Sequence, residues 1–368
     1  MTRNSVLFAL SFIFLLFSAC KKETTETFPI APVLADTLIL EGLSANEVGT
    51  TADLKGANAL NSVFVDLSKG VQSSVLRNRW DIGLYSGSDF RIILNHSIGA
   101  TAIKLDKNNF ADVTAADTVD LINANTLDLG KSSATVDAMT GLFADYLSKT
   151  VIDEVAETDA DNKVYIINRG VSGGAVPVTA TARRWEKIRV VRSGRGYKLS
   201  YAALDQPIQT DIIIPKDPSF NFRYFYFNQA APVEIEPAKK LWDFEWTYST
   251  YKAADGTPVG TADFVLINFA NGVEAAEVKI TTDLTFANFS AANLTGITFS
   301  AQRDAIGTNW RTLNEVTNVS TVNRDRFYLI KDTEGNIYAL RFNSFTRSDG
   351  GTRGKPNLNY RLVQAADN

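Results

Sequence analysis

The chain has 368 residues, of which 45% are hydrophobic and 11% aromatic, enough for a sizeable core and for about two domains. Its formal net charge of -4 leaves no basic footprint for nucleic acid and no general polybasic surface. A single cysteine, Cys20, excludes disulfides within the chain and metal sites built from several thiolates.

The first element is an apolar run over residues 5–20, with Arg3 just ahead of it. The run is shorter than the about 20 residues that span a bilayer, but it has the length of the apolar region of a secretory signal. Ser18 and Ala19 stand at the cleavage point. The whole resembles a bacterial lipoprotein signal over residues 1–20, which implies that Cys20 carries the lipid anchor. An ordinary signal peptide with an incidental cysteine is the alternative.

Residues 21–36 are polar and then punctuated by Pro29 and Pro32, a composition typical of a flexible tether. Lys21, Lys22 and Glu23 loosely resemble the charged export tag that follows the lipidated cysteine in lipoproteins of Bacteroidota. We therefore expect an outer membrane lipoprotein on the cell surface, held on the membrane by acyl chains.

The rest of the chain alternates short β-branched and aromatic runs with Gly, Asn and Asp turn signals, the pattern of an all-β fold with antiparallel sheets and minor helix. Gly335 predicts a tight hairpin, on whose second strand Tyr338, Leu340 and Phe342 share one face. A helix is expected within residues 133–149, where apolar residues including Met139 fall at helical spacing. Strands are predicted at residues 62–67, 80–85, 90–94, 163–168, 185–192, 197–202, 241–250, 262–269, 274–281, 326–332 and 336–345.

Several residues recur in the same order in the two halves, which indicates an internal repeat. Trp80-Asp81 and a strand ending at Asn95 are echoed by Trp242-Asp243 and a strand ending at Asn268. Residues 164–167 are echoed by 327–330, and 197–201 by 338–342, although short apolar strands also look alike by chance. A duplication would place its junction within residues 204–237, which carry five of the ten prolines.

Residues 64–68 and 79–84 precede the strand that ends at Asn95, and residues 326–346 and 354–360 are expected to form a hairpin and a final strand. The first group resembles the opening, and the second group the closing hairpin and final strand, of the HmuY-type haem-binding lipoproteins of Bacteroidota. A single family domain is shorter than this chain, so the resemblance implies two tandem β lobes, at residues 37–215 and 216–368. It also implies a protein that binds haem or a related porphyrin and delivers it to an outer-membrane TonB-dependent receptor.

The same resemblance implies two axial side chains on the haem iron, either two histidines or two methionines. Beyond the signal the chain has one histidine, His96, and one methionine, Met139, so neither pair can form within one molecule. A mixed pair of His96 and Met139 is chemically sensible, because imidazole and thioether both bind haem iron. The competing interpretations are a hydrogen-bonded turn residue at position 96 and a core-filling methionine at position 139.

Three other features carry weaker hypotheses. The acidic run over residues 153–161 lacks EF-hand spacing and favours a solvated loop. The aromatic run over residues 222–227 favours a buried strand or packing between lobes over a ligand platform. A modest basic area suits either contact with haem propionates or protection of strand edges, and its residues are Arg183, Arg184, Arg192 and Arg195.

The sequence contains few candidate arrangements of catalytic residues. With one histidine, no cysteine after the signal and no Gly-x-Ser-x-Gly motif, the common nucleophile arrangements cannot form, and we expect no enzyme. The second hypothesis is therefore a β-rich adhesion or scaffold lipoprotein that has lost its haem ligands, which the scarcity of His and Met favours.

Overall fold

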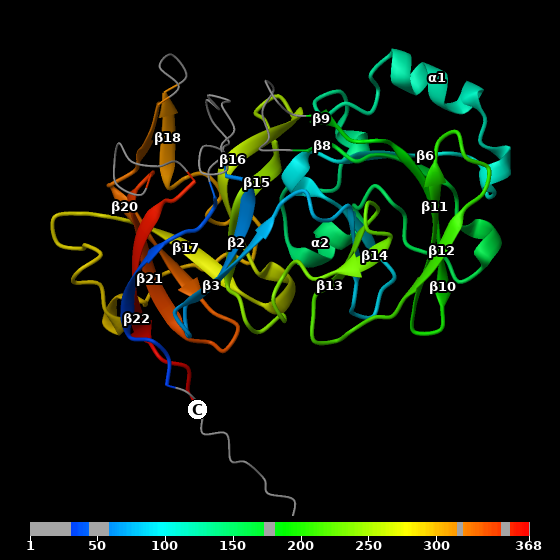
Figure 1. Ribbon diagram of the computed structural model, residues 1–368. Helices are drawn as coiled ribbons and strands as arrows, with labels where there is room; N and C mark the ends of the chain where they lie inside the picture. The colour runs from blue at the N-terminus through cyan, green and yellow to red at the C-terminus, as the bar shows by residue number, and fades with distance from the viewer. Residues whose placement is uncertain (1–30, 44–58, 173–180, 315–318, 347–353, 368) are drawn as a thin grey trace, which may run out of the picture. The chain divides into compact units, whose positions relative to one another are not determined.

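Antiparallel sheets dominate the computed structural model, which describes residues 31–43, 59–172, 181–314, 319–346 and 354–367 (Figure 1). Two sheets have five strands, two have four, and two small sheets have two strands each. The helices of these described residues are short, with α1 at Ala115–Asn123 and α2 at Phe143–Ser148. The predicted all-β class is confirmed. None of the described helices is long and apolar enough to cross a membrane.

The first sandwich is built from residues 82–233. A four-stranded sheet of order β14-β13-β4-β5 and a five-stranded sheet of order β12-β11-β10-β7-β6 share one core, which includes Leu84, Ile167, Leu199 and Phe225. Alternation along each strand turns one face of each sheet toward this core. The strands are β4 (Ile82–Tyr85), β5 (Ile92–Leu94), β6 (Thr101–Lys104), β7 (Tyr165–Asn168), β10 (Glu186–Ser193), β11 (Gly196–Ala203), β12 (Thr210–Ile214), β13 (Phe222–Tyr226) and β14 (Ala231–Val233).

The second sandwich combines the two ends of the described chain. A sheet of order β16-β15-β2-β3 and a sheet of order β1-β22-β21-β20-β17 share a core that includes Val65, Trp246, Ile330 and Leu340. Its strands are β1 (Ala35–Ile39), β2 (Asn61–Asp66), β3 (Val71–Leu76), β15 (Phe244–Lys252), β16 (Pro258–Ile267), β17 (Glu274–Lys279), β20 (Arg326–Lys331), β21 (Ile337–Ser344) and β22 (Asn357–Gln364). The two small sheets pair β8 (Val171–Ser172) with β9 (Thr181–Ala182), and β18 (Arg311–Asn314) with β19 (Val319–Val322).

The sheets cross the predicted boundary between residues 215 and 216. Strand β13 lies after that boundary but pairs with β4, and β2 lies far ahead of it but pairs with β15. In Figure 1 the blue β1 correspondingly runs beside the red β22, as their pairing requires. The first half thus contributes β1 and the β2–β3 hairpin to the second sandwich, and the second half contributes the β13–β14 hairpin to the first. The tandem-lobe division stays a prediction, but a cut at residue 215 would divide the first sandwich.

Matching hydrogen bonds show the internal repeat in the structure. The Asn95 side chain donates to the Trp80 carbonyl at 2.8 Å, and the Asn268 side chain donates to the Trp242 carbonyl at 2.9 Å. Each asparagine precedes a 3-10 helix, η2 (His96–Ile98) or η6 (Phe269–Asn271), that ends at a glycine with positive φ. His96 of the first repeat therefore occupies the position that Phe269 occupies in the second.

Each predicted strand overlaps an observed one, but three other predictions need correction. In the two five-stranded sheets β21 and β10 occupy the same position, the middle of the sheet, whereas β11 lies beside it. The similarity between residues 197–201 and 338–342 therefore links two strands that are not equivalent in the repeat. The tether is shorter than predicted, because β1 begins at Ala35. The helix expected within residues 133–149 forms only over α2, after a 3-10 turn, η4 (Ser133–Thr135). Gly141, at φ +109, interrupts the helical spacing, so Met139 lies in a loop.

A layer of aromatic and aliphatic side chains lies between the two sandwiches. Phe64 of β2 packs edge-on against Trp242, and Tyr224 of β13 packs edge-on against Trp80. The aromatic run over residues 222–227 is a buried strand whose alternate residues join this layer and the first core, which confirms the packing interpretation. Cys20 and the other residues of the predicted signal lie outside the described residues.

Candidate functional site

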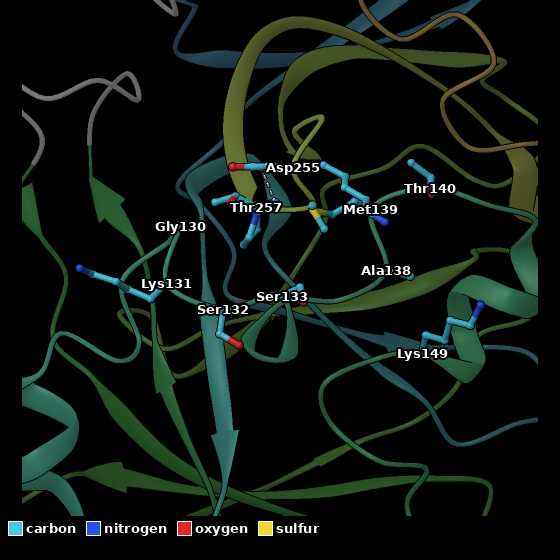
Figure 2. A pocket seen from close by; sticks show the side chains of 13 residues that line it. Gly130, Lys131, Ser132, Ser133, Ala138, Met139, Thr140, Lys149, Asp255 and Thr257 are labelled. Atoms are coloured by element: carbon cyan, nitrogen blue, oxygen red, sulfur yellow. Dashed lines mark hydrogen bonds between the residues drawn. The ribbon is translucent and has the colours of Figure 1, made fainter.

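A cleft of about 660 Å³ opens between two loops (Figure 2). One wall is the segment over residues 130–140 with Lys149, and the other is the hairpin turn between β15 and β16 over residues 252–258. We call this the outer cleft. Its volume lies within the range of about 300–1,000 Å³ that small-molecule sites occupy.

Three lysines give the outer cleft a basic lining. Lys131 and Lys149 come from one wall and Lys252 from the other, and Asp255 is the carboxylate among the lining residues. The side chains of these lysines form no ion pair or hydrogen bond with any residue that the structure describes. Asp255 instead accepts a hydrogen bond from the Thr257 backbone at 2.9 Å, which lowers the pKa of its carboxyl group. The cleft is thus suited to a ligand that carries negative charge.

Met139 stands between the outer cleft and the interior. It lines the outer cleft, where Figure 2 shows its thioether turned toward Thr257, and it is only 8% exposed. It also lines a second space of about 10 Å³, which we call the inner cavity. Asp137, two residues earlier, fixes this loop because its two carboxylate oxygens accept the backbone N–H groups of Leu94 and Val151.

His96 also lines the inner cavity. Its Nδ1 lies 3.3 Å from the Ser249 hydroxyl, and its ring meets the Trp80 ring edge-on at 5.8 Å between centroids. Burial, followed by the charges of Arg303 and Arg77, holds the pKa of His96 well below 6.5. The imidazole is therefore neutral near pH 7, the form that ligates metals.

The structure thus brings the two predicted ligands to one cavity, although they are far apart in the sequence. That cavity, however, has room for about one water molecule and none for a porphyrin ring between the two side chains. Of these two residues, only Met139 also lines the outer cleft. In this conformation the two side chains cannot grip one haem iron from opposite faces.

The predicted basic area is largely occupied by internal ion pairs. Arg183 lies 2.7 Å from Asp81, which Arg169 also contacts through two hydrogen bonds. Arg184 pairs with Glu186 at 2.6 Å, and Arg192 pairs with Glu154 and Glu157 of the acidic run. None of these arginines lines the outer cleft. Contact between this area and haem propionates stays a prediction, although Arg183, Arg184 and Arg192 already pair with carboxylates of the protein.

Sequence reasoning missed the lysines of the outer cleft and one buried cation. Lys131, Lys149 and Lys252 are scattered along the chain, and only the Asp255-Gly256 turn signal hinted at the hairpin that carries one of them. Arg303 lies in no predicted strand and belongs to no motif, but it lines the inner cavity together with His96.

Comparisons with known proteins give one family. The family model described as HmuY protein matches residues 58–360. A solved structure, a HmuY-like haem-binding protein from Bacteroides vulgatus, is 11% identical over 49% of this chain and 93% of its own chain. Its TM-score is 0.21, too low for the overlay to carry an argument. No curated protein matches the chain.

Proposed function

This chain belongs to the HmuY family, and we propose that it is a surface lipoprotein that binds haem or a related porphyrin in the outer cleft and delivers it to an outer-membrane receptor. The observation that carries the proposal is the cleft itself. It combines a ligand-sized volume, one thioether and three lysines whose charges no described side chain compensates.

Within this proposal, Met139 would hold the iron and the lysines would hold the porphyrin carboxylates. A thioether is a neutral, soft ligand that binds haem iron, and iron ligation is the chemistry that the haem brings to the site. Lys131 and Lys149 on one wall and Lys252 on the other would attract the two propionates as point charges. The proposal gives His96 no contact with a porphyrin in the outer cleft, and the mixed His96 and Met139 pair stays a prediction.

A visible-absorbance titration of residues 21–368 with oxidised and reduced haem tests this function. The wild type should give a saturable, sharp Soret band. Met139→Leu keeps a side chain of similar volume but removes the sulfur, so we expect a changed spectrum and at least a tenfold loss of affinity. His96→Phe, which installs the residue of the second repeat, is the matched control and should leave the spectrum unchanged.

The contribution of the lysines is tested through salt. Replacing Lys131, Lys149 and Lys252 together by glutamine should weaken haem binding and flatten its dependence on ionic strength, because exposed charges act through a screened field. The triple variant should unfold as the wild type does, since these side chains have no partners among the described residues. Unchanged affinity at low salt would remove the lysines from the site.

Anchoring and delivery are further parts of the proposal. Cys20 would carry the lipid, so growth with a labelled fatty acid should label the wild type and not Cys20→Ser. Protease added to intact cells should digest a surface protein and spare a periplasmic one. Delivery predicts that loaded protein loses its haem faster when membranes containing a TonB-dependent receptor are added.

The second candidate is a non-catalytic adhesion or scaffold lipoprotein that kept the fold without the ligand. The geometry of His96 favours it, because this histidine faces a cavity that has no room for haem. Flat, nonspecific titrations for the wild type and Met139→Leu alike would decide for this candidate.

A further inference from the structure

An arginine without a partner lies buried between the two sandwiches. Arg303 is 4% exposed, and its guanidinium forms no hydrogen bond or ion pair with any residue that the structure describes. The Tyr146 ring centroid lies 5.3 Å from the guanidinium carbon, and the buried Asp137 and Glu245 side chains interact with Arg303 by charge without a hydrogen bond to it. Withdrawing such a cation from water is strongly unfavourable unless hydrogen bonds and opposite charge replace the lost solvation.

Arg303 lines two spaces in the interior. It lines the inner cavity, and it also lines a space of about 50 Å³ between β5, β13 and β16, which we call the central cavity. Tyr146 and His96 line both spaces as well. Arg303 is held there by its backbone, which donates to the Gly141 carbonyl at 3.0 Å and accepts from the Ile267 N–H at 3.1 Å.

Two further hydrogen-bond donors at the central cavity are also unused. The indole N–H of Trp242 is buried and has no hydrogen-bond partner in the part of the chain that the structure describes. The Tyr146 hydroxyl likewise forms no hydrogen bond within the described ranges, although this side chain is buried. Buried donors are nearly always paired, so the unpaired Trp242 indole N–H, at the same cavity as the Arg303 guanidinium and the Tyr146 hydroxyl, indicates an absent acceptor.

The acidic side chains around the cavities already form hydrogen bonds with other groups. Asp137 accepts from two backbone N–H groups, and Glu236 accepts from the Phe222 N–H and the Tyr224 hydroxyl. Glu245 is hydrogen-bonded to Ser62 and Thr247. None of them lies within ion-pair distance of Arg303 in the described structure, and Asp304, its neighbour in the chain, lines neither cavity.

We propose that the central cavity is a binding site for a small anion, held by the Arg303 guanidinium, the Trp242 indole N–H and the Tyr146 hydroxyl. Chloride and formate represent the class by size and charge. An anion accepts hydrogen bonds, so it can be bound by all three of these donors at once, whereas a water molecule in the same place also needs acceptors. The volume admits an ion of a few atoms and excludes a porphyrin, so this site is independent of the outer cleft.

Bromide is the probe for this site, because it resembles chloride and can be located by its anomalous scattering. Crystals of haem-free protein soaked in bromide should show a peak in the central cavity within hydrogen-bond distance of Arg303. Crystals kept in gluconate, which is too large for the cavity, should show none. Water alone in the central cavity of bromide-soaked crystals would overturn the proposal.

Thermal unfolding in solution, measured at constant ionic strength, is a second test of anion binding. A ligand that binds only the folded protein raises Tm as its concentration rises. Replacing gluconate by chloride should therefore raise the Tm of the wild type and of the control Arg341→Gln, but not that of Arg303→Gln. Trp242→Phe keeps the ring and loses one donor, so it should weaken chloride binding several-fold even if Arg303→Gln fails to fold. Equal Tm values for the wild type in both salts would contradict the proposal.

Discussion

Glu236 should make the stability of the protein fall as the pH rises through neutrality. This side chain is 5% exposed and lies at the central cavity, where its Oε1 accepts the Phe222 N–H at 2.8 Å and its Oε2 lies 3.2 Å from the Tyr224 hydroxyl. Burial is the main cause that raises the pKa of Glu236 from 4.5 to about 8, and these hydrogen bonds only partly oppose it. The folded protein therefore holds this proton at pH 7, while the unfolded chain has lost it.

The sign and size follow from proton linkage. The stabilisation is fully present below pH 4.5, declines as the pH rises and is lost above pH 8. Each pH unit within this window lowers the free energy of unfolding by about 1.4 kcal/mol. Titration of Glu236 should therefore lower the free energy of unfolding of the wild type by about 4 kcal/mol between pH 5 and 8.

Glu236→Gln tests the reasoning, because the amide resembles the protonated acid and does not titrate. Urea unfolding of both proteins at pH 5, 6, 7, 8 and 9 gives the difference in the free energy of unfolding at each pH, and groups that titrate in both proteins cancel. The wild type should lose stability relative to the variant from pH 5 to 8, with little further change at pH 9. A difference that stays constant with pH would refute the assignment of a protonated, buried carboxyl group.

Two other predictions concern the scaffold and use urea unfolding at pH 7. Asn95→Ala and Asn268→Ala should each lower the free energy of unfolding by about 2–4 kcal/mol, because each leaves several backbone carbonyl groups without their hydrogen-bond donor. A loss below about 1 kcal/mol at either site would contradict the equivalent roles of the two asparagines in the repeat. Asp81→Asn should lower the free energy of unfolding by about 3–5 kcal/mol, because it removes the carboxylate that pairs with the buried Arg169 and Arg183. The exposed control Asp153→Asn should lower it by under about 1 kcal/mol, and similar losses for the two variants would refute this reasoning.

The strands were predictable because their signal is local. Tyr338, Leu340 and Phe342 alternate along β21 and all face the second core, as period-two patterning requires. The hairpin at Gly335 was equally local, since its φ of +96° suits glycine. The helical spacing around Met139 was misleading, because the pattern of apolar residues does not register the backbone conformation of Gly141.

The arrangement of the strands and the composition of the site were not predictable from local pattern. Pairing of Val65 with Phe244 joins residues from opposite parts of the chain, and nothing near either residue specifies its partner. Similarly, His96 and Met139 were named from their scarcity, but only the fold shows that one faces the interior and the other also reaches the outer cleft. The central cavity depends on Arg303, whose isolation in the sequence gave no signal.

The most direct test of the proposed function is the position of iron in a haem-soaked crystal. Anomalous scattering at the iron edge locates the metal without reference to the porphyrin density. Our account predicts an iron peak in the outer cleft within bonding distance of the Met139 sulfur, and no such peak in Met139→Leu. Iron bound elsewhere on the protein, or no bound iron in crystals saturated with haem, would contradict it.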